Sequence, residues 1–137
     1  RPVRYLLDTN ILSEITRPQP QAKVVATLRL NRPLSVTSSI TWHELQYGVR
    51  RLPAGKRRSQ LELYLLNLAG LPILVYDEQA AARHAAARVW LESQGKCMSH
   101  ADGQIAAVAE VHGLTVVTRN LADFRHYPGI QLENWFD

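Results

Sequence analysis

The chain has 137 residues, of which 46% are hydrophobic, and a net charge of +4. This length suits one ordinary domain with its own core, and the single cysteine, Cys97, excludes an internal disulfide and a multi-thiol zinc knuckle, so a reducing cytoplasm fits best. The apolar runs are too short to cross a bilayer, no signal-peptide pattern is recognisable, and the positive charge favours a polyanionic partner without establishing one.

The first half of the chain predicts two strands and four helices. An apolar run at residues 3–7 stops at Asp8-Thr9-Asn10, residue types that cap helices, which predicts a strand that leads directly into a helix at 11–16. A second strand is predicted at 34–38, and further helices at 21–30, 40–52 and 56–69. The last two helices are separated by a Pro-Ala-Gly turn and should form a hairpin.

The second half continues the alternation of strands and helices. Strands are predicted at 73–76, 114–118 and 130–132, and helices at about 78–92 and 99–112. β-branched strands that alternate with helices imply parallel pairing through right-handed crossovers. The sequence therefore predicts an α/β fold, an α/β/α sandwich with a central, mainly parallel sheet, in a single domain over residues 1–137. Trp42 and Trp90 are expected in its core.

Four acidic residues fall where such a sheet would bring them together. The functional crevice of an open parallel sheet lies beyond the carboxyl ends of its strands. Asp8 ends the first strand, and Asp123 follows the strand at 114–118 in a loop. Glu44 and Asp102 are expected in the first turns of helices whose N-termini point at this edge. Two charges about 4 Å apart repel by roughly 4 kcal/mol at an effective dielectric near 20, so some acids protonate or a divalent cation neutralises them.

A cation at this edge would be a hard one, because carboxylate oxygens select Mg²⁺ or Mn²⁺. Such a site supports phosphodiester hydrolysis by metal-activated water. Structural alternatives stay open at this point, since Asp8 suits an N-cap, and Thr41-x-x-Glu44 and Ser99-x-x-Asp102 both fit capping boxes. A non-catalytic interaction module whose acids are helix caps is therefore a rival hypothesis.

Three motifs in combination resemble the PIN-domain family. They are LDTNILSE at residues 7–14, ADGQIAAVAEVHGL at 101–114 and TRNLADF at 118–124, and together they look most like the VapC-type toxins of bacterial toxin–antitoxin pairs. The resemblance implies a Mg²⁺- or Mn²⁺-dependent RNA endonuclease. It assigns metal binding and catalysis to four acids, namely Asp8, Glu44, Asp102 and Asp123. Auxiliary polar positions of the family match Thr9, Thr118 and Asn120.

The resemblance also implies partners: an RNA substrate, a cognate antitoxin protein and a second copy of the chain in a homodimer. A PIN-like nuclease that acts on structured DNA is the alternative within enzymes. Glu44 matches the family mainly through its E-L-x-x-G pattern, whereas Gly103 departs from the alanine expected after Asp102. Glycine weakens a helix interior by up to about 1 kcal/mol relative to alanine.

Residues outside the acidic set give weaker signals. Glu14 and several other acids fit exposed helix faces. A broad apolar stripe at 61–68 would suit core packing, a second copy or an antitoxin segment. Five cations around the predicted hairpin turn would suit either RNA phosphates or a solvated helix end. These five are Arg50, Arg51, Lys56, Arg57 and Arg58.

Overall fold

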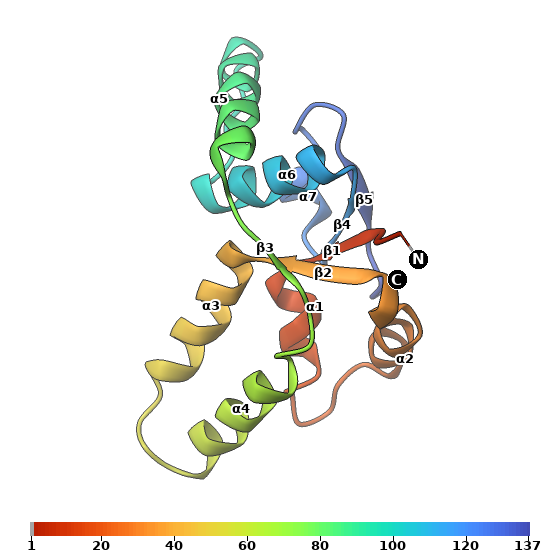
Figure 1. The fold of residues 1–137 in the computed structure, drawn as a ribbon, viewed down its shortest axis with the longest axis vertical. Helices are drawn as coiled ribbons and strands as arrows, with labels where there is room; N and C mark the ends of the chain where they lie inside the picture. Colours follow the sequence, from red (N-terminus) through yellow and green to blue (C-terminus); the bar gives the residue numbers. More distant parts are fainter. Residues whose placement is uncertain (1) are drawn as a thin grey trace.

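Helices alternate with short parallel strands along the chain (Figure 1). The computed structural model describes residues 2–137. Its strands are β1 (Tyr5–Leu7), β2 (Ser35–Ser38), β3 (Ile73–Leu74), β4 (Thr115–Val117) and β5 (Gln131–Glu133). Its helices are α1 (Thr9–Glu14), α2 (Ala22–Asn31), α3 (Ser39–Arg50), α4 (Lys56–Asn67), α5 (Glu78–Ser93), α6 (His100–His112) and α7 (Leu121–Phe124), with a 3₁₀ turn η1 (Arg32–Leu34).

Within the described residues the sheet has five strands in the order β3-β2-β1-β4-β5, and every pair is parallel. This confirms the predicted α/β class and the parallel sheet. The central strand is β1, whose last residue, Leu7, lies opposite Thr37 of β2 and Val117 of β4. The carboxyl ends of these three strands therefore meet at one edge of the sheet.

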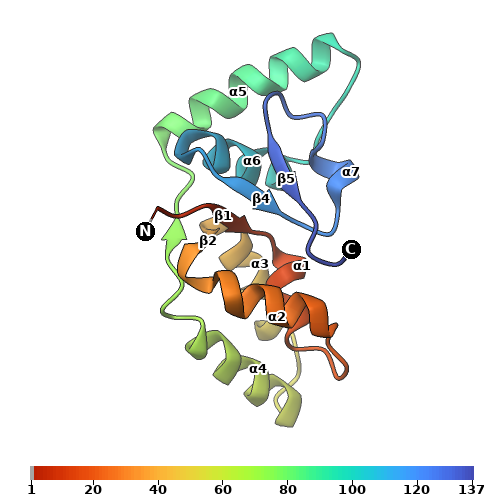
Figure 2. The same ribbon diagram turned by 90° about the vertical axis from the view of Figure 1, so that its right-hand side faces the viewer.

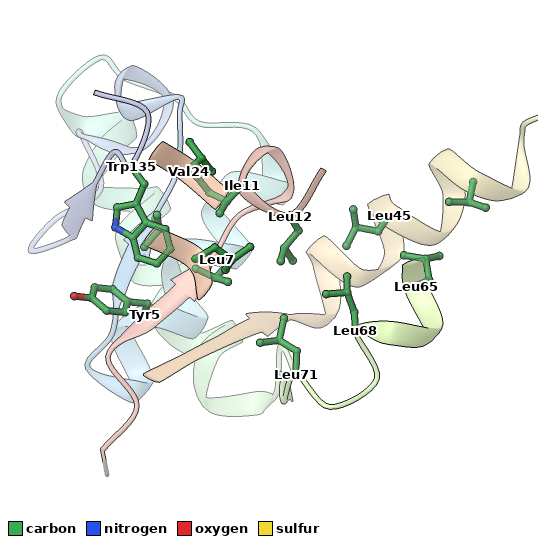
Figure 3. Close-up of a cluster of buried hydrophobic side chains, with 13 residues drawn as sticks. Tyr5, Leu7, Ile11, Leu12, Val24, Leu45, Leu65, Leu68, Leu71 and Trp135 are labelled. Atoms are coloured by element: carbon green, nitrogen blue, oxygen red, sulfur yellow. The ribbon is translucent and has the colours of Figure 1, made fainter. Parts of the chain in front are cut away.

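Two hydrophobic clusters cover the two faces of the sheet, because neighbouring side chains of a strand point in opposite directions. Figure 2 shows α5 and α6 on one side of the strands and α1–α4 on the other. Leu6 belongs to the cluster with α5 and α6 residues, and Leu7 to the cluster with residues of α1–α4. Figure 3 shows the cluster on the side of α1–α4, which contains Leu7 together with Ile11, Leu12, Val24, Leu45, Leu65, Leu68 and Leu71. Burial of each such leucine contributes roughly 1.5–3 kcal/mol.

Several expected details are wrong in the structure. β3 is shorter than the predicted strand at 73–76, and the segment expected to be a loop around Asp123 contains the short helix α7. Trp42 is half-buried against the core, but Trp90 is 47% exposed. α5 buries only a narrow stripe through Ala87 and Leu91, and Trp90 lies about 100° around the helix from Leu91.

The predicted hairpin at the end of the first half is confirmed. α3 and α4 pack against each other across a short turn at residues 51–55.

Along residues 2–137, none of the helices combines the length and the apolar character that a bilayer span requires.

Candidate active site

Asp8 lies where β1 passes into α1, and only 6% of its surface is exposed. One carboxylate oxygen accepts a hydrogen bond from the Thr9 backbone N–H at 2.8 Å, which caps α1. The other accepts from the Thr118 hydroxyl at 2.9 Å and from the Asn10 side-chain amide at 3.4 Å. Burial raises the pKa of Asp8 above its ordinary value, although these hydrogen bonds act in the opposite direction. A carboxylate used only as a cap does not require this burial.

Glu44 lies beside Asp8 and is linked to it through one residue. The Thr9 hydroxyl donates to the Glu44 carboxylate at 2.8 Å, while the Thr9 backbone N–H binds Asp8. The negative charge of Glu44 contributes to the raised pKa of Asp8. The helix α3 begins at Ser39, and the Ser38 hydroxyl caps it by accepting from the Thr41 N–H at 3.1 Å. Glu44 is thus in the second turn, so the predicted first-turn position and the Thr41-x-x-Glu44 capping box are both wrong.

Asp102 and Asp123 extend the acidic group on the other side of Asp8. Asp102 is half-buried in the first turn of α6, and its own N–H donates to the hydroxyl of the N-cap Ser99 at 3.1 Å. Burial raises the pKa of Asp102, and the charges of Asp8 and Asp123 add to this effect. Asp123 is exposed in the first turn of α7.

The four acids therefore form one electrostatic group at the carboxyl edge of the sheet, with Asp8 in its centre. They reach this edge from four different elements, because α1 and α3 start where β1 and β2 end. α6 precedes the parallel strand β4 and returns across the sheet, which places its N-terminus at the same edge (Figure 1).

A network of neutral polar groups around the buried Thr118 supports Asp8. The Thr118 hydroxyl is fully buried, donates to Asp8 and accepts from the Asn120 backbone N–H at 3.0 Å. The Asn10 side chain donates to Asp8 and Thr118 and accepts from the Arg119 backbone N–H at 2.9 Å. Of the three residues predicted to be auxiliary, Thr9 and Thr118 thus contact the acids directly, and Asn120 bonds the network through its backbone.

Sequence reasoning missed Asn10 as a member of this network, although its position as the third residue of the D-T-N motif was the available signal. Its side chain links the first turn of α1 to Thr118 and Arg119, which follow β4. A residue 109 positions away in the chain could be assigned as its partner only from the sheet order, which places β1 next to β4.

The PIN-domain family model matches residues 5–130. This chain belongs to the PIN-domain family. Toxin FitB of Neisseria gonorrhoeae is 44% identical over 124 residues, which cover 87% of this chain and 89% of FitB. The tRNA(fMet)-specific endonuclease VapC of Salmonella typhimurium is 34% identical over 133 residues, 97% and 98% of the two chains. The crystal structure of FitAcB from Neisseria gonorrhoeae superimposes with a TM-score of 0.89 at 39% identity over 96% of this chain and 98% of that chain. Within the family, the chain is thus one of the VapC- and FitB-type toxin ribonucleases of toxin–antitoxin systems.

The acidic group of this PIN domain offers donors that fit a hard divalent cation. In residues 2–137, no three acidic, histidine or cysteine side chains converge tightly enough to form a complete protein cage for a metal ion. Mg²⁺ does not require such a cage, since it usually keeps several waters and binds one or two carboxylates together with substrate phosphate. Burial is the main reason that the pKa values of Asp8 and Asp102 are raised, and the neighbouring negative charges, which a cation would neutralise, add to this effect.

The glycine that follows Asp102 in this PIN domain is explained by its neighbour on α5. A Cβ atom at Gly103 would lie 2.3 Å from Nε2 of His84, which is closer than real Cβ contacts. The other ring nitrogen, Nδ1, lies 2.9 Å from the Tyr76 hydroxyl. The imidazole therefore occupies the space of a side chain at position 103, and α5 packs closely against the turn that carries Asp102.

Glu14, in the first motif, is buried at 4% exposure, so the expectation of an exposed helix face is wrong. Its carboxylate accepts from the Gln21 backbone N–H at 2.8 Å and from the Arg17 guanidinium at 3.2 Å. The Gln21 hydrogen bond is the main reason that the pKa of Glu14 lies below its ordinary value. Glu14 thus closes the turn between α1 and α2 and lies outside the acidic group.

Proposed function

We propose that this PIN domain, taken as residues 1–137, is a Mg²⁺- or Mn²⁺-dependent RNA endonuclease with Asp8, Glu44, Asp102 and Asp123 as its catalytic and metal-binding residues. The observation that carries the proposal is the burial of Asp8 within a chain of acidic charges: the charge of Glu44 acts on Asp8, and the charge of Asp8 acts on Asp102. Such an arrangement is costly for folding alone, and a cation with an RNA phosphate would offset it.

The chain's own residues have distinct tasks in this proposal. When bound, Mg²⁺ or Mn²⁺ would lower the pKa of the attacking water and stabilise the leaving oxygen. Asp8 is held in one orientation by the Thr9 N–H and the Thr118 hydroxyl, and Glu44 by the Thr9 hydroxyl. Asp123 is exposed and can meet incoming water and substrate.

The proposed substrate is RNA, and the proposed partner is a cognate antitoxin that restrains the chain in the cytoplasm, where the chain works as a homodimer. Support for RNA comes from the name of the Salmonella relative, a tRNA(fMet)-specific endonuclease, and from the net charge of +4. Support for the antitoxin comes from the relationship to FitB, which is named a toxin.

The test is cleavage of single-stranded RNA by the purified chain in Mn²⁺ or Mg²⁺, with EDTA as the metal-free control and single-stranded DNA as the substrate control. We expect cleavage of RNA that EDTA abolishes. Asp8→Asn and Asp102→Asn should each lower kcat at least about a hundredfold, as loss of a group that acts on transition-state charge does. The exposed acid Glu92 provides the matched control, and Glu92→Gln should keep wild-type activity.

The rival hypothesis of a non-catalytic module rests on the caps that Asp8 and Ser99 provide. Full cleavage by folded Asp8→Asn and Asp102→Asn variants would contradict the proposed site. Absence of cleavage in the wild-type chain on all RNA tested, with normal binding of an antitoxin, would favour the non-catalytic module.

A further inference from the structure

An unusual row of side chains lies on the exposed side of α3, next to the acidic group. His43 and Tyr47 stack with ring centroids 6.2 Å apart and planes 30° apart, and the Arg51 guanidinium lies 5.6 Å from the Tyr47 ring centroid. The three residues are one helical turn apart, which aligns them on one face. We call this row the α3 ladder.

The α3 ladder contributes little to the core. Tyr47 is 58% exposed, and His43 and Arg51 are exposed as well. Buried α3 residues lie on a different side of the helix, at Leu45 and Val49. The ring surface of the ladder is therefore available to a ligand.

The ladder reaches the candidate active site at Arg51. His43 directly precedes Glu44 in the chain, and Arg51 lines a groove of about 290 Å³ whose walls also include Thr9 and Glu44. A strand that leaves the acidic group through this groove therefore reaches Arg51, whose guanidinium lies against the Tyr47 ring.

Positive charge extends this path past the end of α3. Arg50, Lys56 and Arg57 are exposed near Arg51 in the sequence, and within residues 2–137 none of these four cations has an acidic partner. Of the five cations around the hairpin turn, Arg58 alone is paired, with Glu62 at 3.7 Å. Unneutralised cations beside exposed rings are the combination that binds single-stranded nucleic acid, since the cations contact phosphates and the rings stack on bases.

We infer that His43, Tyr47 and Arg51 form a stacking platform for unpaired bases of the RNA strand that enters the acidic group. The inference rests on the proposed RNA endonuclease function and adds the form of the substrate, an unpaired segment next to the cleaved bond. The three side chains are substrate-positioning residues, and they take no part in the bond cleavage itself.

The first experiment measures binding of a fluorescent oligouridine RNA in EDTA, which prevents cleavage. Tyr47→Ala should weaken binding about tenfold, whereas Tyr47→Phe, which keeps the ring, should bind as the wild type does. Trp90→Ala is the matched control, because Trp90 is also exposed but belongs to α5, in the other helical layer. Should Tyr47→Ala not fold by circular dichroism, His43→Ala replaces it.

A second probe separates stacking from charge. An abasic strand of the same length keeps the phosphates and lacks the bases, so the wild type and Tyr47→Ala should bind it equally. The inference would be overturned if the wild type and Tyr47→Ala bound oligouridine equally well. It would also be overturned if Tyr47→Ala lost the same affinity for oligouridine and for the abasic strand.

Cleavage kinetics distinguish this inference from the proposed function. In Mn²⁺, Tyr47→Ala should raise KM with kcat unchanged. A wild-type chain that shows ladder-dependent RNA binding but never cleaves RNA would contradict the proposed function and leave the ladder standing. RNA cleavage by a Tyr47→Ala variant with unchanged KM would support the proposed function and overturn the inference about the ladder. A variant that escapes inhibition by an antitoxin while binding RNA normally would identify the ladder as a protein contact, and would overturn the inference.

Discussion

At the residue scale, the contact of Gly103 with His84 determines how α5 meets the turn that carries Asp102. Gly103→Ala should destabilise the fold by about 1–3 kcal/mol, because overpacking of this size displaces a ring, and the gain in helix propensity is smaller. In a His84→Ala background the same substitution should stabilise by up to about 1 kcal/mol, since the obstacle is gone. Urea denaturation of the wild type, the two single variants and the double variant measures this change of sign. If the two substitutions changed the free energy of unfolding additively, the predicted contact would be contradicted.

His84 also gives the fold a specific pH dependence. Burial lowers its pKa below the ordinary value of 6.5, and the charges of His100 and Arg88 add to this effect. The unfolded chain therefore takes up the proton first, so this contribution to stability is complete above about pH 6.5 and is lost as the pH falls toward the lower, folded pKa. His84→Gln should show a smaller loss of Tm than the wild type between about pH 8 and pH 5, measured by calorimetry.

At the element scale, α1 is held from two sides. Its N-terminus carries Asp8 and Thr9, and its last turn accepts a hydrogen bond at the Leu12 carbonyl from the Tyr64 hydroxyl of α4. Burial raises the pKa of Tyr64 to about 12, so the hydroxyl keeps its proton at neutral pH and can donate this bond.

Tyr64→Phe should cost about 0.5–1.5 kcal/mol in the free energy of unfolding, because the Leu12 carbonyl loses its side-chain donor while the ring remains. Tyr47→Phe removes the same hydroxyl from an exposed ring and is the matched control, with no expected change. Chemical denaturation of the two variants makes the comparison. Equal stabilities of both variants and the wild type would show that Tyr64 does not brace α1.

The elements predicted correctly are those with strong local signals, such as the alanine-rich α6 that Gly113 ends in a left-handed conformation. One of the errors arises where two nearby residues offer the same chemistry. Ser38 and Thr41 both suit an N-cap; in the structure Ser38, the last residue of β2, caps α3, so Glu44 falls in the second turn. The sequence likewise could not reveal that α5 leaves the side with Trp90 uncovered.

At the scale of the whole molecule, the strand order brings acids that are far apart in the sequence together at one edge of the sheet. Asp8 and Thr118 are 110 positions apart and form a hydrogen bond because β1 and β4 are neighbours. Parallel alternation predicted the common edge for the acids. It did not predict the distances, because side-chain rotamers and the added helix α7 determine how far Asp123 reaches.

The whole-molecule prediction concerns metal binding and stability. If the acidic group binds Mg²⁺ in the folded chain alone, a tenfold excess of Mg²⁺ over its Kd should stabilise the protein by about 1.4 kcal/mol, which raises Tm by roughly 3–6 °C. The Asp8→Asn/Asp102→Asn double variant should melt higher than the wild type in EDTA, because burial and mutual repulsion raise the pKa of both carboxyl groups and so disfavour their charged forms in the fold.

Addition of Mg²⁺ should then leave the Tm of the double variant unchanged while the Tm of the wild type rises. The two Tm values should therefore converge or cross as the metal concentration increases. Differential scanning calorimetry in EDTA and over a Mg²⁺ series makes both comparisons, and Glu92→Gln should follow the wild type throughout, since this exposed acid pairs only with Arg88 on α5. A double variant that melts lower than the wild type in EDTA would mean that the two acids act chiefly as helix caps. An equal response to Mg²⁺ would place the metal elsewhere on the chain.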